Sequence, residues 1–280
     1  MAQQGDIIDK TAQELVRVAA FPSRYASRQV IEFLDTLGES FCLLLRSLRH
    51  IVGSPSTWMD SIYHMGSIGV NSLALVVITV AFSGAVLSLY SSLLLVKWGV
   101  GAYVGGGLAL SIVREIAPVL TAVVVAARSG SAIAAELGTM KVTEQIDAMR
   151  SLSLDPVKLL VTPRIIACLV VFPMMTVFAN AAGIIGGYLV AVSNGVPAGS
   201  FRESITRLVE GHDISMGLVK AAIFGLVIAL VCCQQGLRTY GGATGVGRST
   251  TNAVVISIVL VYILNFFLAW LMFGQPEGAL

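Results

Sequence analysis

Beyond residue 60, the chain alternates between long apolar runs and short polar segments. A helix needs about 20 residues to cross the hydrocarbon core of a bilayer. Five runs approach or exceed this length: residues 65–96, 116–140, 165–200, 217–235 and 250–273. The pattern therefore predicts an all-α integral membrane protein with five transmembrane helices, in which residues 61–280 form the transmembrane domain. Pro173 predicts a kink in the third helix.

The stretch before the first run has a different, amphipathic pattern. Apolar residues recur at steps of three and four, and charged residues follow the same steps about 200° away on a helix. The neighbouring membrane domain favours a helix lying in the membrane surface over the alternative, a soluble core helix. Residues 1–60 are thus predicted to be a cytoplasmic N-terminal region with an interfacial helix. The apolar stripe is Val30, Leu34, Leu37, Phe41, Leu44, Leu48 and Ile51, and the charged stripe is Arg28, Glu32, Asp35, Glu39, Arg46 and Arg49.

The composition excludes several classes of protein. With 56% hydrophobic and only 12% charged residues, the chain is unlike soluble domains, which average about 25% charged. The net charge of +2 comes from dispersed residues, which argues against nucleic-acid binding. The four cysteines lie in or beside apolar runs without metal-ligand spacing, so no metal site is predicted. The polar N-terminus predicts no cleaved secretory signal.

The basic residues predict the orientation in the membrane. Five spans put the termini on opposite sides, and cytoplasmic segments carry the excess of lysine and arginine. Twelve of these residues fall on the side of the N-terminus and residues 141–164, and five fall on the other side. The N-terminus is therefore predicted to be cytoplasmic and the C-terminus external. Residues 194–215 would lie outside, with a short helix over residues 201–210.

Small residues at every fourth position mark the second span. Helices in lipid associate through close backbone approach, so this ridge predicts a packing face. Its partner is either another helix of the same chain or a second copy of the protein. The ridge consists of Ala122, Ala126, Gly130, Ala134 and Gly138.

Two charged residues interrupt the same span. Arg128 lies near its middle, where a charge costs at least ~2.5 kcal/mol, so it must face protein, water or a lipid phosphate. The partners within reach are Glu136, Glu115 or helix C-terminal carbonyls. We expect structural roles for Arg128 and Glu136 rather than direct substrate contact.

A short amphipathic helix is predicted just after the second span. Its apolar and charged residues separate at helical spacing, and Asp155-Pro156 ends it. Composition does not decide whether this helix is a simple connection or a docking element. The apolar face is Val142, Ile146, Met149 and Leu152, and the charged face is Glu144, Asp147 and Arg150.

These segments resemble the MlaE (YrbE) family of ABC-transporter permeases. The likeness covers roughly residues 40–273, with several long strings in order. They are Arg114-Glu-Ile-Ala-Pro-Val-Leu-Thr, Ala127-Arg-Ser-Gly-Ser-Ala-Ile-Ala-Ala-Glu-Leu-Gly-Thr-Met, Glu144-Gln-Ile-Asp-Ala-Met, Asp155-Pro156, Pro163-Arg164 and Gly241-Gly-Ala-Thr-Gly-Val-Gly-Arg-Ser-Thr-Thr.

The resemblance implies a homodimeric permease in the bacterial inner membrane, although a plastid envelope stays open. A cytoplasmic ABC ATPase, which binds ATP and Mg²⁺, would dock on the coupling helix, residues 144–152. Its contact residues would be Glu144, Gln145, Asp147, Ala148 and Met149. Periplasmic MCE-domain subunits and a small STAS-domain protein are the other expected partners.

The resemblance also implies a cargo and a cavity. The cargo is phospholipid or a related lipid, held in an outward-facing cavity between the two permeases. Arg114 and Glu115 would lie beside this cavity, at the outer end of the second span. Family members often carry a glycine near Ser153, which this chain lacks.

Other functions fit the sequence less well. The chain has no Gly-Lys dipeptide and hence no P-loop, so it is predicted to bind no cofactor of its own. The glycines from Gly241 to Gly247 favour a flexible cytoplasmic turn over a nucleotide site, because no strand precedes them. No catalytic motif is present, so an enzyme is unlikely.

Two non-enzymatic alternatives stay open. The first is a secondary carrier in which Glu115 or Glu136 titrates, but five spans do not divide into inverted repeats. The second is a non-transporting membrane scaffold. Such a scaffold would leave residues 144–149 without a partner.

Overall fold

The computed structural model describes residues 34–49 and 55–273, and every regular element in these ranges is helical. Five helical rods are long and apolar enough to cross a membrane, which confirms the prediction of an all-α membrane protein with five spans. They cover Trp58–Lys97, Gly101–Val142, Val157–Ser193, Gly211–Leu237 and Gly242–Phe273.

Three of the rods are single helices and two contain irregular turns. The single helices are α2 (Pro55–Lys97), α9 (Gly211–Leu237) and α10 (Gly242–Phe273). The second rod joins η1 (Gly101–Tyr103), α3 (Val104–Ser111), η2 (Ile112–Ile116), α4 (Ala117–Val125), η3 (Ala126–Gly130) and α5 (Ser131–Val142). The third joins η4 (Val157–Val161) to α7 (Thr162–Ser193), which continues as a helix through Pro173.

The segments η2, η3 and η4 are π-helical. Such turns widen the helix locally and occur frequently at functional sites. Here η2 carries Arg114 and Glu115, and η3 carries Arg128. Two of the three π turns therefore hold charged residues that the sequence marked as candidates.

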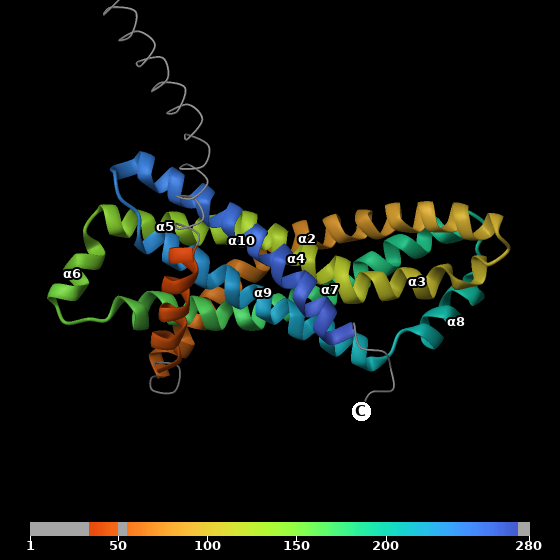
Figure 1. Cartoon of the computed structure of the whole chain (residues 1–280), viewed down its shortest axis with the longest axis horizontal. Coiled ribbons are helices and arrows are strands. Elements are labelled where there is room, and N and C mark those ends of the chain that lie inside the picture. Colours follow the sequence, from red (N-terminus) through yellow and green to blue (C-terminus); the bar gives the residue numbers. More distant parts are fainter. Residues whose placement is uncertain (1–33, 50–54, 274–280) are drawn as a thin grey trace, which may run out of the picture.

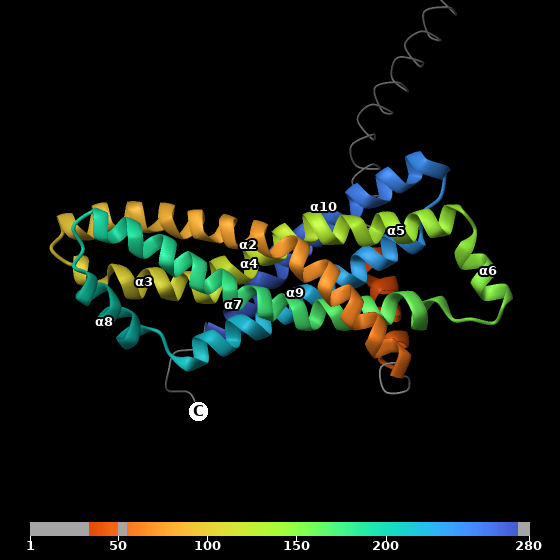
Figure 2. The ribbon, with the colours of Figure 1, turned by 180° about the vertical axis from the view of Figure 1, so that it is seen from behind.

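The rods form an elongated bundle with distinct ends. Figure 1 shows α6 (Gln145–Ser151) at one end, and α3 with α8 (Ala198–Leu208) at the other. Seen from behind, α2 and α7 run side by side (Figure 2). The most apolar part of α9 is 61% buried, against 17% for α10. Helix α9 is thus the central helix, and α10 offers most of its surface to lipid or to another protein.

Helices α2 and α7 touch backbone to backbone. A Cβ atom added at Gly84 would overlap the carbonyl of Gly183, and one added at Gly186 would overlap the carbonyl of Ala81. Ser88 Oγ donates a hydrogen bond of 2.6 Å to the Gly187 carbonyl. Close approach of this kind maximises van der Waals contact, which holds helices together in lipid.

The helix over residues 34–49 crosses the bundle near α9 (Figure 1). Its buried residues are polar, including Ser40 and Ser47, whereas Leu34, Phe41 and Leu48 are each at least half exposed. An outward apolar stripe is compatible with the predicted helix in the membrane surface, which stays a prediction. Leu37 and Leu44 of the predicted stripe are half-buried, and Val30 and Ile51 lie outside the described residues.

Several predicted boundaries were wrong, and two of them have a clear physical cause. The second span begins at Gly101 rather than residue 116, because Arg114 and Glu115 form ion pairs inside the bundle and do not end the helix. The third ends at Ser193 rather than residue 200, because Gly195 adopts a φ of 87° and the chain then turns into α8.

The glycine-rich string at residues 241–247 is mostly helical, so the predicted flexible turn was also wrong. Helix α10 begins at Gly242, directly after Gly241 with a φ of 87°. Gly245 lies so close to the Tyr240 carbonyl that a side chain there would overlap it. The glycines allow a sharp reversal between α9 and α10.

Candidate functional site

The first candidate site is α6, which projects from one end of the bundle (Figure 1). Glu144 has a left-handed φ of 61° and redirects the chain before the helix begins at Gln145. Ile146 is fully buried and anchors the helix. Glu144, Gln145, Asp147 and Ala148 are exposed, and Met149 is half-buried. Four of the five predicted docking residues are therefore accessible to a partner.

Asp147 fixes the orientation of α6 relative to α5. Its carboxylate accepts a hydrogen bond from Lys141 Nζ at 2.7 Å and pairs with Arg150 at 3.3 Å. The Lys141 hydrogen bond, with the positive charges of both residues, holds the pKa of Asp147 below its ordinary value. A lowered pKa keeps the carboxylate ionised at neutral pH. Its contribution to stability is lost only as the pH falls through that lowered pKa.

The predicted apolar face of this helix was only partly right. The helix ends at Ser151, and Leu152 is 71% exposed rather than packed with Ile146. Leu154 is also exposed, at 46%. Ser153 has a φ of 59°, a backbone conformation that favours glycine. The left-handed turn at Ser153 redirects the chain and leaves both leucines exposed beside α6. Leu152 lies within the predicted docking segment, residues 144–152, and Leu154 lies beyond it.

The second candidate site is a cluster of charged side chains inside the bundle. Arg114 pairs with Asp213 at 2.6 Å, and Lys220 Nζ lies 2.7 Å from Glu115 Oε1. Lys220 is completely buried and Asp213 is 2% exposed, whereas Arg114 and Glu115 are 33% and 39% exposed. Each pair thus joins a buried charge on α9 to a more accessible charge on η2.

Further polar contacts hold the cluster in place. Asn265 on α10 donates a hydrogen bond of 2.8 Å to Glu115, and Lys220 donates one of 3.0 Å to the Arg114 carbonyl. The Arg114 guanidinium stacks 4.6 Å from the centre of the Phe273 ring. Asp213 also accepts the backbone N–H of Glu210 at the start of α9. The cluster therefore links η2, α9 and α10.

The cluster lies deeper than expected. Arg114 and Glu115 are inside the second rod and not at its outer end. Sequence reasoning missed Asp213, Lys220 and Asn265 as members. Lys220 near the start of the fourth span and Asn265 within the fifth were visible signals, because polar groups inside spans seek partners. Only folding could show that these two residues share Glu115.

The intramembrane charges pair differently from the prediction. Glu136 forms an ion pair of 2.9 Å with Arg164, whose side chain is 2% exposed. Glu115 pairs with Lys220. Arg128 is exposed and forms no ion pair with any residue in the described ranges. Of the three candidate partners named for Arg128, the two carboxylates Glu136 and Glu115 are therefore excluded.

The small-residue ridge of the second rod lies inside the chain. Ala122, Ala126 and Ala134 are completely buried. A Cβ atom at Gly130 would lie 2.9 Å from Cys232 Sγ, and one at Gly138 would lie 2.8 Å from Thr239 Oγ1. The ridge therefore faces the end of α9, and another surface has to serve any contact between two copies.

The fold and these sites define a multi-pass, all-α membrane protein with an exposed connecting helix and an internal charged cluster. The model of the family described as "Permease MlaE" matches residues 61–271. The chain belongs to the MlaE permease family.

Relatives agree with this membership over most of their length. The chain is 41% identical to a "Probable ABC transporter permease protein" of Synechocystis over 89% of this chain and 95% of the relative. It is 33% identical to the "Intermembrane phospholipid transport system permease protein MlaE" of Haemophilus influenzae, over 88% and 95%. It is 37% identical to the chloroplastic protein TRIGALACTOSYLDIACYLGLYCEROL 1 of Arabidopsis thaliana, over 80% and 64%.

Proposed function

We propose that this chain is the membrane-spanning subunit of an ABC-type phospholipid transporter. Two copies would form the lipid path, and a separate ATPase would bind ATP and Mg²⁺ and drive the cycle. MCE-domain subunits would receive or deliver lipid at the α8 end, and a small STAS-domain protein would join the complex. The family membership and the names of its relatives support this proposal.

The observation that carries the proposal is the presentation of α6. The connection between α5 and the third rod carries this short helix at the tip of the bundle, beyond the ends of the rods (Figure 1). Its exposed acidic and amide side chains stand beside two exposed leucines. Apolar groups exposed outside a membrane typically mark contact with a partner protein. Lys141 and Arg150 hold Asp147, so the surface is pre-ordered for docking.

The charged cluster supports a lipid as cargo. Arg114 and Glu115 are partly exposed, while their partners on α9 are buried. A zwitterionic or anionic headgroup would find a cation and an anion side by side there. Phe273, stacked on Arg114, adds an apolar surface next to the charges.

The cluster argues against the ion-coupled carrier. In a carrier, Glu115 or Glu136 would have to gain and lose a proton in each cycle. Both carboxylates are instead paired with buried cations, Lys220 and Arg164. Neutralising either carboxylate would leave a buried charge without its partner, which typically costs about 3–5 kcal/mol.

The first test is purification of the tagged protein from its native membrane in a mild detergent, followed by mass spectrometry. We expect a P-loop ATPase, MCE-domain subunits and phospholipid to co-purify with two copies of the chain. Recovery of the chain alone, with transport in liposomes that follows a proton or sodium gradient, would replace the proposal with the carrier.

Asp147→Lys tests the docking surface. The substitution reverses the charge beside Lys141 and Arg150, so α6 should lose its fixed orientation and the complex its coupled activity. We expect lipid-stimulated ATP hydrolysis to fall at least tenfold while the protein stays folded. The matched control is Glu203→Lys, which breaks an exposed pair with Arg207 on α8, at the opposite end, and should leave co-purification of the ATPase unchanged. Unchanged hydrolysis in Asp147→Lys would contradict the assignment of α6.

A further inference from the structure

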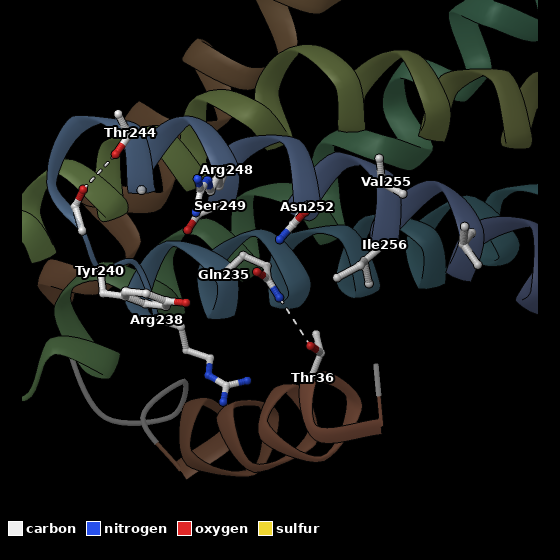
Figure 3. A pocket seen from close by; sticks show the side chains of 13 residues that line it. Thr36, Gln235, Arg238, Tyr240, Thr244, Arg248, Ser249, Asn252, Val255 and Ile256 are labelled. Carbon is white, nitrogen blue, oxygen red and sulfur yellow. Dashed lines mark hydrogen bonds between the residues drawn. The ribbon is translucent and has the colours of Figure 1, made fainter. Parts of the chain in front are cut away.

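A cavity lies at the α6 end of the bundle, away from the charged cluster. It has a volume of about 720 Å³ and is enclosed by the helix over residues 34–49, the end of α9 and the first turns of α10. Figure 3 shows Gln235 and Asn252 directed from α9 and α10 toward the helix that carries Thr36. A volume of this size is typical of ligand sites.

The two ends of the cavity differ in chemistry. One end carries hydrogen-bond donors, namely Arg238, Arg248 and Asn252. The other end is lined by Val255, Ile256 and Val259 along α10. The lining changes from polar to apolar along α10, from Arg248 in its first turns to Ile256 further along the helix (Figure 3). Such a lining fits a molecule with a polar head and a hydrocarbon tail.

The polar end carries excess positive charge. Arg238 shares its charge with Glu39, at 3.3 Å, and both side chains are about half exposed. Arg248 forms no ion pair with any residue in the described ranges. The matching head is therefore anionic. Basic pockets between transmembrane helices on the cytoplasmic side are known to bind anionic lipid headgroups.

The position of the cavity beside the predicted interfacial helix favours a membrane lipid as its ligand. The helix over residues 34–49 contributes Thr36 to the cavity and exposes Leu34, Phe41 and Leu48. Such an outward apolar stripe is typical of a helix in the membrane surface. The polar end thus lies at the level of lipid headgroups. Asn252 precedes Asn265 by thirteen residues on α10, a rise of about 20 Å, so this cavity is separate from the charged cluster.

We propose that this cavity binds an anionic phospholipid from the leaflet at the α6 end, with its phosphate at Arg248 and a chain along Ile256 and Val259. The lipid joins the interfacial helix to α9 and α10. The inference rests on the proposed function only for the orientation of the chain, which makes this the cytoplasmic leaflet.

The test measures lipid binding to the detergent-purified, delipidated full chain by native mass spectrometry. The probes are phosphatidylglycerol, phosphatidylcholine and inorganic phosphate. We expect phosphatidylglycerol to bind at least tenfold more tightly than phosphatidylcholine, and inorganic phosphate to bind weakly. Arg248→Ala should lower phosphatidylglycerol affinity about tenfold, and Arg248→Lys should lower it less.

Two further variants keep the result interpretable. Arg207→Ala removes an exposed arginine of α8 at the opposite end and should leave lipid affinity unchanged. Ile256→Ser should weaken phosphatidylglycerol binding without affecting any phosphate binding. Equal affinity of the wild type and Arg248→Ala for phosphatidylglycerol would overturn the site. So would inorganic phosphate that binds as tightly as the lipid.

The outcome is independent of the proposed transport function. If the ATPase co-purifies with the wild type but Arg248→Ala binds lipid normally, only the cavity assignment fails. If no ATPase co-purifies while Arg248 controls lipid affinity, the site stands and the proposed function fails.

Discussion

At the scale of single residues, the buried charges are each paired with a more exposed charge. Lys220 has no exposed surface, yet its amine contacts the Glu115 carboxylate and the Arg114 carbonyl. Burial of an unpaired ammonium costs several kcal/mol, and the contact with Glu115 offsets this cost for Lys220. The exposed pair of Arg207 and Glu203 has the same distance of 2.6–2.7 Å but faces water. Exposed pairs contribute at most about 1 kcal/mol.

Glu115→Gln tests this difference. The amide can still accept a hydrogen bond, but Lys220 loses the negative charge beside it. We expect a loss of about 3 kcal/mol, in line with the breaking of other buried pairs, measured as thermal unfolding in detergent. The control, Glu203→Gln on α8, should change stability by less than about 1 kcal/mol. Equal effects of the two substitutions would show that burial of Lys220 does not govern the pair.

At the scale of helices, small residues let the rods approach closely. The contact of α5 with α9 depends on Gly130, which faces Cys232 and Ile228. A side chain there has no space to occupy. Gly107 on α3 offers the contrast, because no atom lies within 4 Å of a Cβ built at that position.

Gly130→Leu should separate α5 from α9. Overpacking of a tight contact costs about 1–3 kcal/mol, so we expect a clear fall in the unfolding temperature and in the yield of assembled protein. Gly107→Leu is the matched control and should keep or slightly raise stability, since leucine is the better helix former. A Gly130→Leu protein with normal assembly and thermal stability would refute the close-approach argument.

An ion pair also braces the two helices that carry α6. Glu136 on α5 and Arg164 on α7 lie 2.9 Å apart, and Arg164 is buried. Arg164 also donates a hydrogen bond of 2.6 Å to the Leu160 carbonyl, so the guanidinium is fixed from two sides. This ion pair therefore holds α5 and the first turn of α7 at a fixed distance from each other.

Exchange of the two charges tests the brace. Glu136→Arg and Arg164→Glu should each destabilise the protein, because each places like charges together. The double variant should recover part of the loss, giving an interaction energy within the range of about 0.5–3 kcal/mol found for contacting residues. Thermal unfolding of the four proteins provides the cycle, and strictly additive losses would rule out a direct interaction.

At the scale of the whole molecule, the bundle has two chemically different ends. One presents α6 and the arginine-lined cavity, and the other presents α3 and α8 (Figures 1 and 2). The distribution of basic residues predicts that the α6 end is cytoplasmic. Transport by a partner ATPase requires this orientation, because ATP is a cytoplasmic substrate.

Cysteine labelling checks the orientation. Cys168, Cys232 and Cys233 are buried, so replacement of the exposed Cys42 by serine gives a background with little reactivity. Ser151→Cys on α6 should then react with an impermeant maleimide only in inverted vesicles. Thr206→Cys on α8 should react only in intact spheroplasts. The reverse pattern would invert the topology and remove the support for ATPase docking at α6.

Much of the molecule could be predicted because hydrophobic length and spacing act locally. The five spans, the short helix after Glu144 and the short helix near residue 201 all follow from such patterns. Predictions that depended on long-range partners were less accurate. Glu136 and Glu115 were two of the three candidate partners for Arg128, yet both carboxylates bind other cations. Nothing in the local sequence distinguishes Arg164 or Lys220 as the partner.

The sequence by itself determined the class of protein, because apolar runs of about 20 residues have no stable place outside a bilayer. The motif strings that begin at Arg114, Ala127 and Gly241 indicated the family, and the family model confirms it. Only the tertiary structure decided which charges meet, because residues from distant helices, such as Glu115, Lys220 and Asn265, satisfy one another only after the rods pack. The cavity at Arg248 also depends on packing, since Thr36 on one wall lies 199 residues before Gln235 on the next.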